Sequence, residues 1–211
     1  MARLRQQETI DLLLLYNLPQ AVLVRRAGCA VVLDIADDLP AMLAHEVGPA
    51  VGGLAQRLAA TMLRRLASRC DLVTVASGTL QERLPFPTLL VPNGVDPVEL
   101  AAASSGRVAV PAGRPVVGYL GAIEYFIDVD LVLGAAQGLP QVTFLLVGGG
   151  RQLAAARRRV KALGLDNVLL PGPVAHDRGL DYVAAMDLGL IPFVRGPVAD
   201  GALPLKLFEY A

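Results

Sequence analysis

A lysine and a glutamate near the carboxyl end of the sequence have a spacing that suits a small anionic ligand. Lys206 and Glu209 are three residues apart, so they share one face if this segment is a helix. An ammonium there can neutralise a diphosphate, and a carboxylate can accept both hydrogen bonds of a ribose diol. The competing interpretation is a solvent-exposed salt bridge between the two side chains, which stabilises a helix only weakly. Spacing alone favours the salt bridge.

Three turns that follow predicted strands in the same half are further candidates. Gly121 leaves room for a phosphate against bare backbone amides, beside a helix N-terminus that favours negative charge. The run Gly148–Gly150 lacks the spacing of the G-x-G-x-x-G fingerprint, which argues against nicotinamide binding. The extended backbone around Val174 can offer N–H and C=O groups to the edge of a base. For each turn the alternative is an ordinary connection without a ligand.

A group of aspartates in the first half raises the question of a metal. Asp34, Asp37 and Asp38 lie at or just after the end of an apolar run, and carboxylates in such a place can hold Mg²⁺. No second acidic cluster accompanies them. The sequence therefore predicts no metal site, and we interpret these aspartates as a solvated strand end and helix start that line an interdomain cleft.

Four arginines form a second charged group. Arg57, Arg64 and Arg65 lie near one face of a predicted helix, and Arg69 follows it. One interpretation is a solvated helix face. The other is attraction to an anionic membrane or to a lipid-phosphate acceptor, which would make the protein peripheral at the inner face of a membrane.

The bulk composition excludes several classes of function. Hydrophobic residues make up 54% of the 211 residues and charged residues 18%, so a sizeable core is expected. Lys plus Arg and Asp plus Glu number 19 each, which argues against a nucleic-acid partner. The apolar run Leu12–Val24 is too short and too interrupted to span a bilayer. We expect a cytoplasmic protein in which Cys29 and Cys70 are free thiols in apolar surroundings.

Short apolar runs alternate with helical patterns, as in parallel sheets covered by helices. The predicted strands are Asp11–Leu15, Ala30–Ile35, Leu72–Val75, Thr88–Val91, Pro115–Leu120, Thr143–Val147, Val168–Leu170 and Leu188–Phe193. The predicted helices are Val51–Ser68, Val129–Gln137, Gln152–Leu163, Arg178–Ala185 and one that begins near Pro204. In the first of these helices Leu54, Leu58, Met62 and Leu66 recur every four residues, which predicts a buried stripe.

These elements define the predicted fold class, which is α/β with two Rossmann-like parallel-sheet units, both incomplete. Residues 1–100 are expected to form the amino-terminal unit, 101–113 a small-residue linker and 114–211 the carboxyl-terminal unit. The first unit has no glycine-rich opening turn, and the last helix stops at Ala211 without a cap. We therefore expect a sequence truncated at both ends.

Several segments resemble, in order, those of one enzyme family. Leu205–Ala211 resembles the P-x-K-x-x-E-Y-x-A segment of retaining GT-B glycosyltransferases of the family 4 type. Val91–Asp96 resembles the i-P-N-G-V-D that ends the family's amino-terminal domain, and Val117–Ala122 is similar to the v-G-Y-f-G that opens its second domain. The family's f-x-l-v-G-x-G, N-V-x-x-x-G and a-D-x-v-x-x-x-S segments are similar to Phe144–Gly149, Asn167–Gly172 and Cys70–Ser77.

The resemblance implies the retaining transfer of a sugar from a nucleotide-diphosphate donor to a glycan, a lipid-linked acceptor or a cell-envelope precursor, with neither metal nor other cofactor. Carried over by position, Glu209 holds the ribose of the donor. Lys206 and the amides of Gly121 hold its diphosphate, and Val174 meets its base.

The sequence departs from the family pattern in two places. Many members have another glutamate eight residues before the ribose-binding one, where this chain has Gly201 with Asp200 beside it. Many also have basic residues soon after the first glycine-rich loop, where this chain is acidic. The phosphates are therefore expected to rely on Lys206 or on Arg195.

The family's amino-terminal domain supplies a histidine near the reacting sugar, and the stretch that would carry it is not evident here. His45 and His176 are interpreted as helix-surface or capping residues, so the sequence names no catalytic base. Two other functions stay open. A nucleotide-sugar epimerase of the same fold would interconvert the free donor, and a non-catalytic nucleotide-binding module would never release a sugar.

Overall fold

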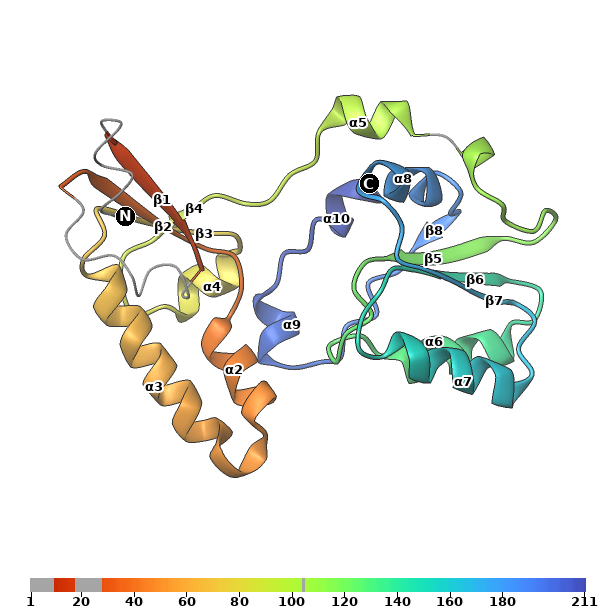
Figure 1. Cartoon of the computed structure of the whole chain (residues 1–211), viewed down its shortest axis with the longest axis horizontal. Coiled ribbons are helices and arrows are strands. Elements are labelled where there is room, and N and C mark those ends of the chain that lie inside the picture. Colours follow the sequence, from red (N-terminus) through yellow and green to blue (C-terminus); the bar gives the residue numbers. More distant parts are fainter. Residues whose placement is uncertain (1–9, 18–27, 104) are drawn as a thin grey trace. The chain divides into compact units, whose positions relative to one another are not determined.

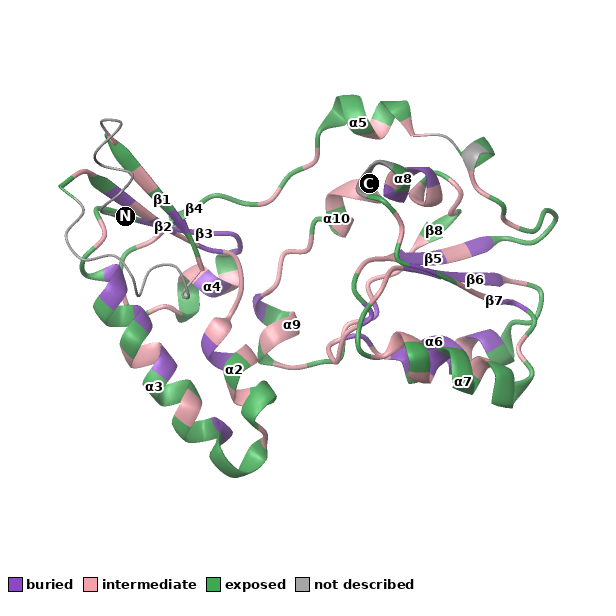
Figure 2. Ribbon diagram, in the orientation of Figure 1, coloured by how far each residue is buried: buried purple, intermediate pink, exposed green. Residues whose placement is uncertain are grey.

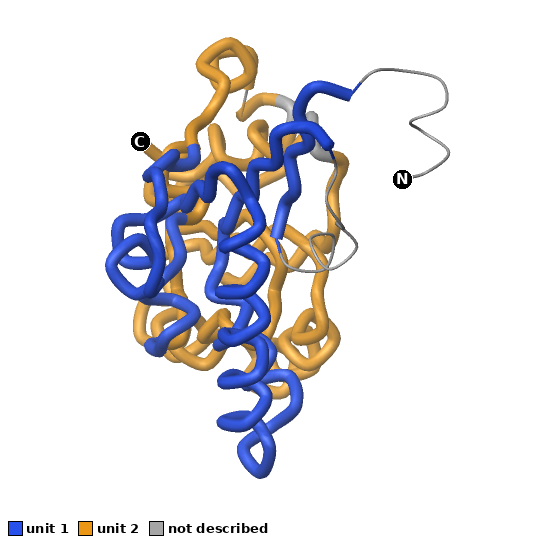
Figure 3. The backbone as a smooth tube through the Cα atoms, turned by 90° about the vertical axis from the view of Figure 1, so that its left-hand side faces the viewer, with its two compact units in different colours: residues 1–93, 195–203 blue, residues 94–194, 204–211 orange. Residues whose placement is uncertain are grey.

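The computed structural model describes residues 10–17, 28–103 and 105–211. The chain divides into two compact units, which Figure 3 distinguishes by colour. Unit 1 comprises residues 1–93 and 195–203, and unit 2 comprises residues 94–194 and 204–211. Each unit contains a four-stranded parallel sheet with interleaved helices, so the predicted α/β class is confirmed.

Unit 1 contains a sheet whose strands follow chain order. Its strands are β1 (Leu12–Tyr16), β2 (Ala30–Ile35), β3 (Leu72–Val75) and β4 (Leu89–Leu90), paired in the order β1-β2-β3-β4. Its helices are α2 (Leu39–Val47), α3 (Pro49–Ala67), α4 (Gly78–Arg83) and α9 (Pro197–Gly201). The predicted helix start after Asp38 is confirmed by α2, which that residue caps, whereas the sequence did not predict the short helices α4 and α9.

The core of unit 1 lies between the sheet and α3. Alternate residues of β2 point to opposite faces, so Leu33 and Ile35 are fully buried beneath Leu63 and Leu66 of α3. On β1 the same alternation leaves Leu14 exposed on the other face. Cys29 and Cys70 are free and half-buried, and they pack against this core.

One prediction about α3 is wrong. The helix is present almost as expected, but Leu54, Leu58 and Met62 are exposed, and of the predicted stripe only Leu66 is buried. The buried face instead carries small residues, and a side chain at Gly52 would meet the Ala44 carbonyl at 2.6 Å. Because α2 packs this closely along α3, the helix turns a different face inward from the one that the leucine spacing indicates.

Unit 2 contains the second sheet. Its strands are β5 (Val116–Leu120), β6 (Thr143–Val147), β7 (Val168–Gly172) and β8 (Leu188–Gly189). Its helices are α5 (Pro97–Ala102), the 3-10 turn η2 (Ser105–Arg107), α6 (Val129–Gly138), α7 (Leu153–Leu163), α8 (His176–Val183) and α10 (Lys206–Glu209). The predicted linker 101–113 thus begins inside α5 and includes η2.

The strand order of unit 2 is β7-β6-β5-β8. The chain therefore adds β6 and β7 on one side of β5 and then places β8 on the other side. Such a reversal places helices on both faces of a parallel sheet, and α6 and α7 indeed cover one face while α8 covers the other (Figure 1). The fully buried strand β6 separates the two layers. β8 ends at Gly189, earlier than predicted, shortly before Pro192, which has no N–H for a ladder.

Candidate functional site

The reversal of strand order in unit 2 marks the place where a ligand is expected. In open parallel sheets ligands bind beyond the carboxyl ends of the strands, at the point where the order reverses, which here lies between β5 and β8. The turn at Gly121 directly follows β5, and α10 packs over the same region through Lys206 and Tyr210.

The glycines after β6 have a packing role. The N–H of Gly148 donates to the carbonyl of Gly172 at 2.9 Å, and the N–H of Ile123 donates to that of Gly149 at 2.6 Å. A Cβ on Gly148 would overlap the carbonyl oxygen of Gly121, and one on Gly150 would lie 2.5 Å from the Ile123 carbonyl oxygen. The glycine run therefore lets neighbouring loops pack backbone against backbone, which explains it without a dinucleotide.

Two features expected at Gly121 need correction. Its N–H is not bare, because it donates to the carbonyl of Val147 at 2.8 Å and extends the β5–β6 ladder by one residue. The next helix is also not adjacent: α6 begins only at Val129, and its cap Asp128 already accepts a hydrogen bond from the Leu131 N–H. The N–H without a partner in the described chain is that of the next residue, Ala122.

The missing side chain at Gly121 makes room for Lys206. A Cβ at Gly121 would lie 2.6 Å from Cε and 2.7 Å from Nζ of Lys206, so the ammonium rests directly on this turn. The same Nζ lies 5.2 Å from the ring centroid of Tyr119, within the range of a cation–π contact. The structure thus brings together Lys206 and Gly121, two residues that are 85 positions apart (206 − 121) in the sequence.

The Lys206 ammonium forms neither a hydrogen bond nor an ion pair with any residue that the structure describes. Burial lowers the pKa of Lys206 from its ordinary value, and the nearby Glu209 carboxylate opposes that change only in part. The helix-surface salt bridge that spacing alone favours is therefore not formed. A half-buried ammonium without a partner is costly, and an anion would relieve that cost.

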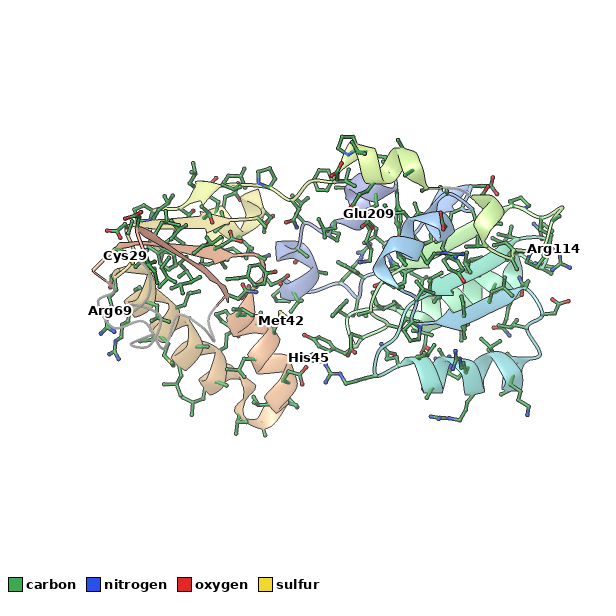
Figure 4. The ribbon with its side chains drawn as sticks, turned by 45° about the horizontal axis from the view of Figure 1, so that its top comes forward. Cys29, Met42, His45, Arg69, Arg114 and Glu209 are labelled. Carbon is green, nitrogen blue, oxygen red and sulfur yellow. The ribbon has the colours of Figure 1, made fainter. Side chains whose placement is uncertain are left out.

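Tyr210 fixes α10 on the sheet. Its hydroxyl oxygen accepts a hydrogen bond from the Leu120 N–H at 2.9 Å, and its ring lies where a side chain at Gly189 would have to be. Burial, with a contribution from Glu209, raises the pKa of Tyr210 to about 12. Neither Tyr119 nor Tyr210 was predicted as a site residue, although they lie inside the motifs Val117–Ala122 and Leu205–Ala211. Figure 4 shows Glu209 on the same helix.

Val174 lies just after β7. Its side chain packs against the core cluster of Val116, Leu145 and Val147. Its backbone N–H and C=O take part in no hydrogen bond with described residues, so both groups are available to a base edge. The role that the sequence predicts for Val174 needs these backbone groups and not the side chain.

Arg195 and Asp200 belong to unit 1, so the structure does not group them with Lys206 and Glu209. The Asp200 carboxylate lies 3.5 Å from the Arg83 guanidinium, which also approaches Asp38 and donates to the Pro197 carbonyl at 2.9 Å. Asp200 thus helps to hold α9 on α4 within unit 1. Arg195 is exposed.

The aspartates after β2 have separate partners. Asp34 accepts a hydrogen bond from the Thr74 hydroxyl at 2.6 Å, and Asp38 caps α2 through the Ala41 N–H. Asp37 lines a cavity of about 270 Å³, and burial raises the pKa of its carboxyl. Within residues 10–17, 28–103 and 105–211 no group of three His, Cys, Asp or Glu side chains could hold a metal ion.

Both histidines lie in helices. His45 lies in the last turn of α2, and α8 begins at His176.

The chain is similar in sequence to part of two curated sugar-transferring enzymes. No protein-family model matches it. The chain is 30% identical over 156 residues to 2-deoxystreptamine N-acetyl-D-glucosaminyltransferase from Streptomyces fradiae, a match that covers 67% of the chain and 37% of that protein. It is 29% identical over 157 residues to the teichuronic acid biosynthesis glycosyltransferase TuaH of Bacillus subtilis (strain 168), covering 69% of the chain and 39% of that protein. The chain thus spans less than half the length of these curated relatives.

Solved structures share the fold. Sucrose-phosphate synthase from Thermosynechococcus elongatus superposes with a TM-score of 0.77 at 18% identity, covering 99% of this chain and 55% of that one. HepE from Anabaena, in complex with UDP-glucose, superposes with a TM-score of 0.58 at 25% identity, covering 83% of this chain and 52% of that one. The chain thus has the two parallel-sheet units of the GT-B fold, and its sequence is similar to part of two curated glycosyltransferases.

Proposed function

We propose that unit 2 binds the nucleotide-sugar donor of a glycosyltransferase, with Lys206 as the group that holds the diphosphate. The observation that carries this proposal is the half-buried Lys206 ammonium, which has no ion-pair partner among the described residues and rests on the Gly121 turn at the reversal of strand order. The similar proteins also support the proposal, because two curated relatives are named as glycosyltransferases and HepE is described in complex with UDP-glucose.

Each group of the site has a distinct role in this proposal. The Lys206 ammonium and the free N–H of Ala122 neutralise the diphosphate, the Glu209 carboxylate accepts the ribose hydroxyls, and the backbone at Val174 meets the base. During transfer the bond between the sugar C1 and the diphosphate oxygen breaks, and a bond from C1 to the acceptor hydroxyl oxygen forms while the hydroxyl proton passes to the departing diphosphate. Lys206 then stabilises the negative charge that develops on the leaving diphosphate.

Three finer features belong to the same proposal. Transfer proceeds without a metal ion, because the ammonium supplies the positive charge that the leaving group needs. The sugar keeps its anomeric configuration, and the acceptor is a glycan, a lipid-linked molecule or a cell-envelope precursor. The last point is supported by the relative named for teichuronic acid biosynthesis. Proton NMR of the product's anomeric signal distinguishes retention from inversion.

The decisive experiment is a calorimetric titration of UDP, GDP and ADP against the whole chain, with and without EDTA. One diphosphate should bind best, and EDTA should leave its affinity unchanged. Lys206→Met should weaken binding by about tenfold or more, since it removes a charge-assisted contact to the diphosphate. The matched control is Lys161→Met, because Lys161 is the only other lysine of the chain and is exposed on α7. Equal losses in both variants would refute a specific role for Lys206.

Glu209 can be tested separately with a ligand that lacks the ribose diol. Glu209→Gln should weaken binding of the preferred diphosphate by roughly fivefold, because an amide is a poorer acceptor than a carboxylate. The same substitution should have little effect on the 2′,3′-dideoxy form of that ligand. A similar loss with both ligands would exclude the ribose as the partner of Glu209.

Turnover assays address the two alternative functions. An epimerase would interconvert the free donor sugar when no acceptor is present. A non-catalytic module would bind the diphosphate as tightly as predicted and never release a sugar. Because only binding is required of Lys206, the titration tests the donor site whichever of these outcomes is found.

A further inference from the structure

The outer face of α3 carries a stripe of exposed apolar side chains. Val51 is 53% exposed, Leu54 64%, Leu58 59% and Met62 45%. Their spacing of three and four residues places them in one row along the helix, on a different face from Leu63 and Leu66, which pack on the sheet. We call these four residues the α3 stripe. In Figure 2 most of α3 is coloured as exposed.

The charge around the α3 stripe has a single sign. The helix Pro49–Ala67 contains no Asp or Glu. Arg57, Arg64 and Arg65 lie on it and Arg69 follows, and all four are exposed. Within the described chain none of the four is in an ion pair, in contrast to Arg83, which has two carboxylate partners. In Figure 4 Arg69 points outward from the end of α3.

An apolar row with uncompensated guanidiniums fits one kind of partner better than others. A nucleic acid would pair with the arginines but leave the leucines uncovered. A second copy of the chain would cover the leucines but bring two sets of arginines together. An anionic lipid surface satisfies both, because apolar side chains enter the acyl boundary while arginines reach the phosphates. No helix within the described residues is long and apolar enough to cross a bilayer.

We propose that α3 lies in the plane of an anionic membrane surface, with the α3 stripe inserted and the four arginines on lipid phosphates. This inference depends on unit 1 alone and does not rest on the donor site proposed for unit 2. It gives the unexpected outward orientation of Leu54, Leu58 and Met62 a physical reason.

Vesicle sedimentation of the whole chain tests the proposal. The chain should bind vesicles of phosphatidylcholine with phosphatidylglycerol at low salt and leave pure phosphatidylcholine vesicles largely unbound. High salt should weaken binding by about tenfold or more, because it screens the arginines from the lipid phosphates. Absence of binding to the anionic vesicles at low salt would overturn the proposal.

Paired variants separate this surface from general charge. Arg64→Gln with Arg65→Gln should weaken vesicle binding by about tenfold, and Arg158→Gln with Lys161→Gln, which removes the same charge from exposed positions of α7, should not. Leu54→Ser with Leu58→Ser should also weaken binding. The control Leu131→Ser with Leu163→Ser removes exposed leucines of α6 and α7 and should leave it unchanged.

Three results would overturn the inference. One is equal losses in the α3 variants and their controls, which would indicate non-specific attraction. Another is unchanged binding in both α3 variants while circular dichroism and thermal melting show that they are folded. The third is a dimer that the leucine substitutions on α3 dissociate in a protein that binds no vesicles, which would make a second copy the occupant of the stripe.

Discussion

In both units an aspartate binds the backbone of the neighbouring strand where a parallel strand begins, but the two units differ in strand order. In unit 1 the Asp71 carboxylate accepts the Val31 N–H at 2.7 Å, and the Asp71 N–H donates to the Val31 carbonyl at 2.8 Å. In unit 2 Asp187 makes the same two bonds to Val116, at the same two distances. An aspartate just before a strand thus fixes its register on the neighbouring strand in both units.

Strand order separates the two units. The described strands of unit 1 follow one another across the sheet, whereas unit 2 reverses direction at β5. Where the strand order reverses, the loops that follow two adjacent strands lead to opposite faces of the sheet. This separation leaves space for a ligand between the loops. The comparison teaches that shared local motifs do not locate the site. The candidates that the structure brings together, Lys206 and Gly121, lie in unit 2 because of its topology, whereas Arg195 and Asp200 lie in unit 1.

The largest expected effect comes from the close-packed loops of unit 2. Gly148 has a φ of +138°, and a Cβ there would overlap the Gly121 carbonyl. Gly148→Ala should therefore destabilise unit 2 by about 2–4 kcal/mol through strain and overpacking. Native-state hydrogen exchange should show the loss in the amides of β5 and β6.

The matched control lies in unit 1. Gly53 is inside α3 and nothing lies within 4 Å of a Cβ built there, so Gly53→Ala should stabilise the helix by about 0.5–1 kcal/mol. If Gly148→Ala were as well tolerated as Gly53→Ala, the backbone-to-backbone packing of the unit 2 loops would not exist in solution.

A second effect concerns the pH dependence of diphosphate binding. Burial lowers the pKa of Lys206 below the ordinary 10.5, and the ligand needs the protonated form. Affinity should therefore be constant near neutral pH and fall as pH rises through the lowered pKa. Tyr119 and Tyr210, which face Lys206 and Glu209, have raised pKa values and stay neutral in that range.

Calorimetry of diphosphate binding between neutral pH and pH 10.5 measures this fall. Lys206→Arg is the control, since a guanidinium keeps its charge throughout and should give a flatter profile. A wild-type profile as flat as that of the arginine variant would mean that the ammonium is not the group that the ligand contacts.

Much of the fold could be predicted because local signals and tertiary structure agree. β2, β3 and β6 have the predicted bounds, since buried strands of a parallel sheet are continuous apolar runs. The prediction that Leu54, Leu58 and Met62 are buried is wrong for a physical reason. The leucine spacing specifies one apolar face but not which way that face points, and the small residues Gly52 and Ala59 pack inward instead.

The candidate site was predictable in its parts and not in its contacts. The residue types of Lys206 and Gly121 indicate a phosphate site. The two residues come into contact, however, only because Gly121 has no Cβ and because a helix much later in the sequence packs beside it. The hydrogen bond of the Gly121 N–H also depends on how far the β5–β6 ladder extends. The residue pattern of one segment cannot predict how two strands align with each other.

A third, smaller effect concerns Tyr210, which ties α10 to β5. Tyr210→Phe leaves the Leu120 N–H without its acceptor, which should reduce the stability of unit 2 by about 1–2 kcal/mol. The same change should weaken diphosphate binding slightly, because α10 carries Lys206. Urea denaturation and titration of the variant measure both. An unchanged stability with normal binding would show that the ring alone positions the helix.

The smallest effect tests the likeness of the two units. Asp71→Ala and Asp187→Ala each remove one acceptor for a backbone N–H, so each should destabilise its own unit by about 1 kcal/mol. Hydrogen exchange should report faster opening of β2 and β3 in the first variant and of β5 and β8 in the second. Because the bonds have the same lengths, unequal losses would mean that the surroundings of each strand and not the aspartate set its register. Faster exchange in the unit that was not altered would mean that the two sheets open together, and then the donor site would depend on unit 1 as well.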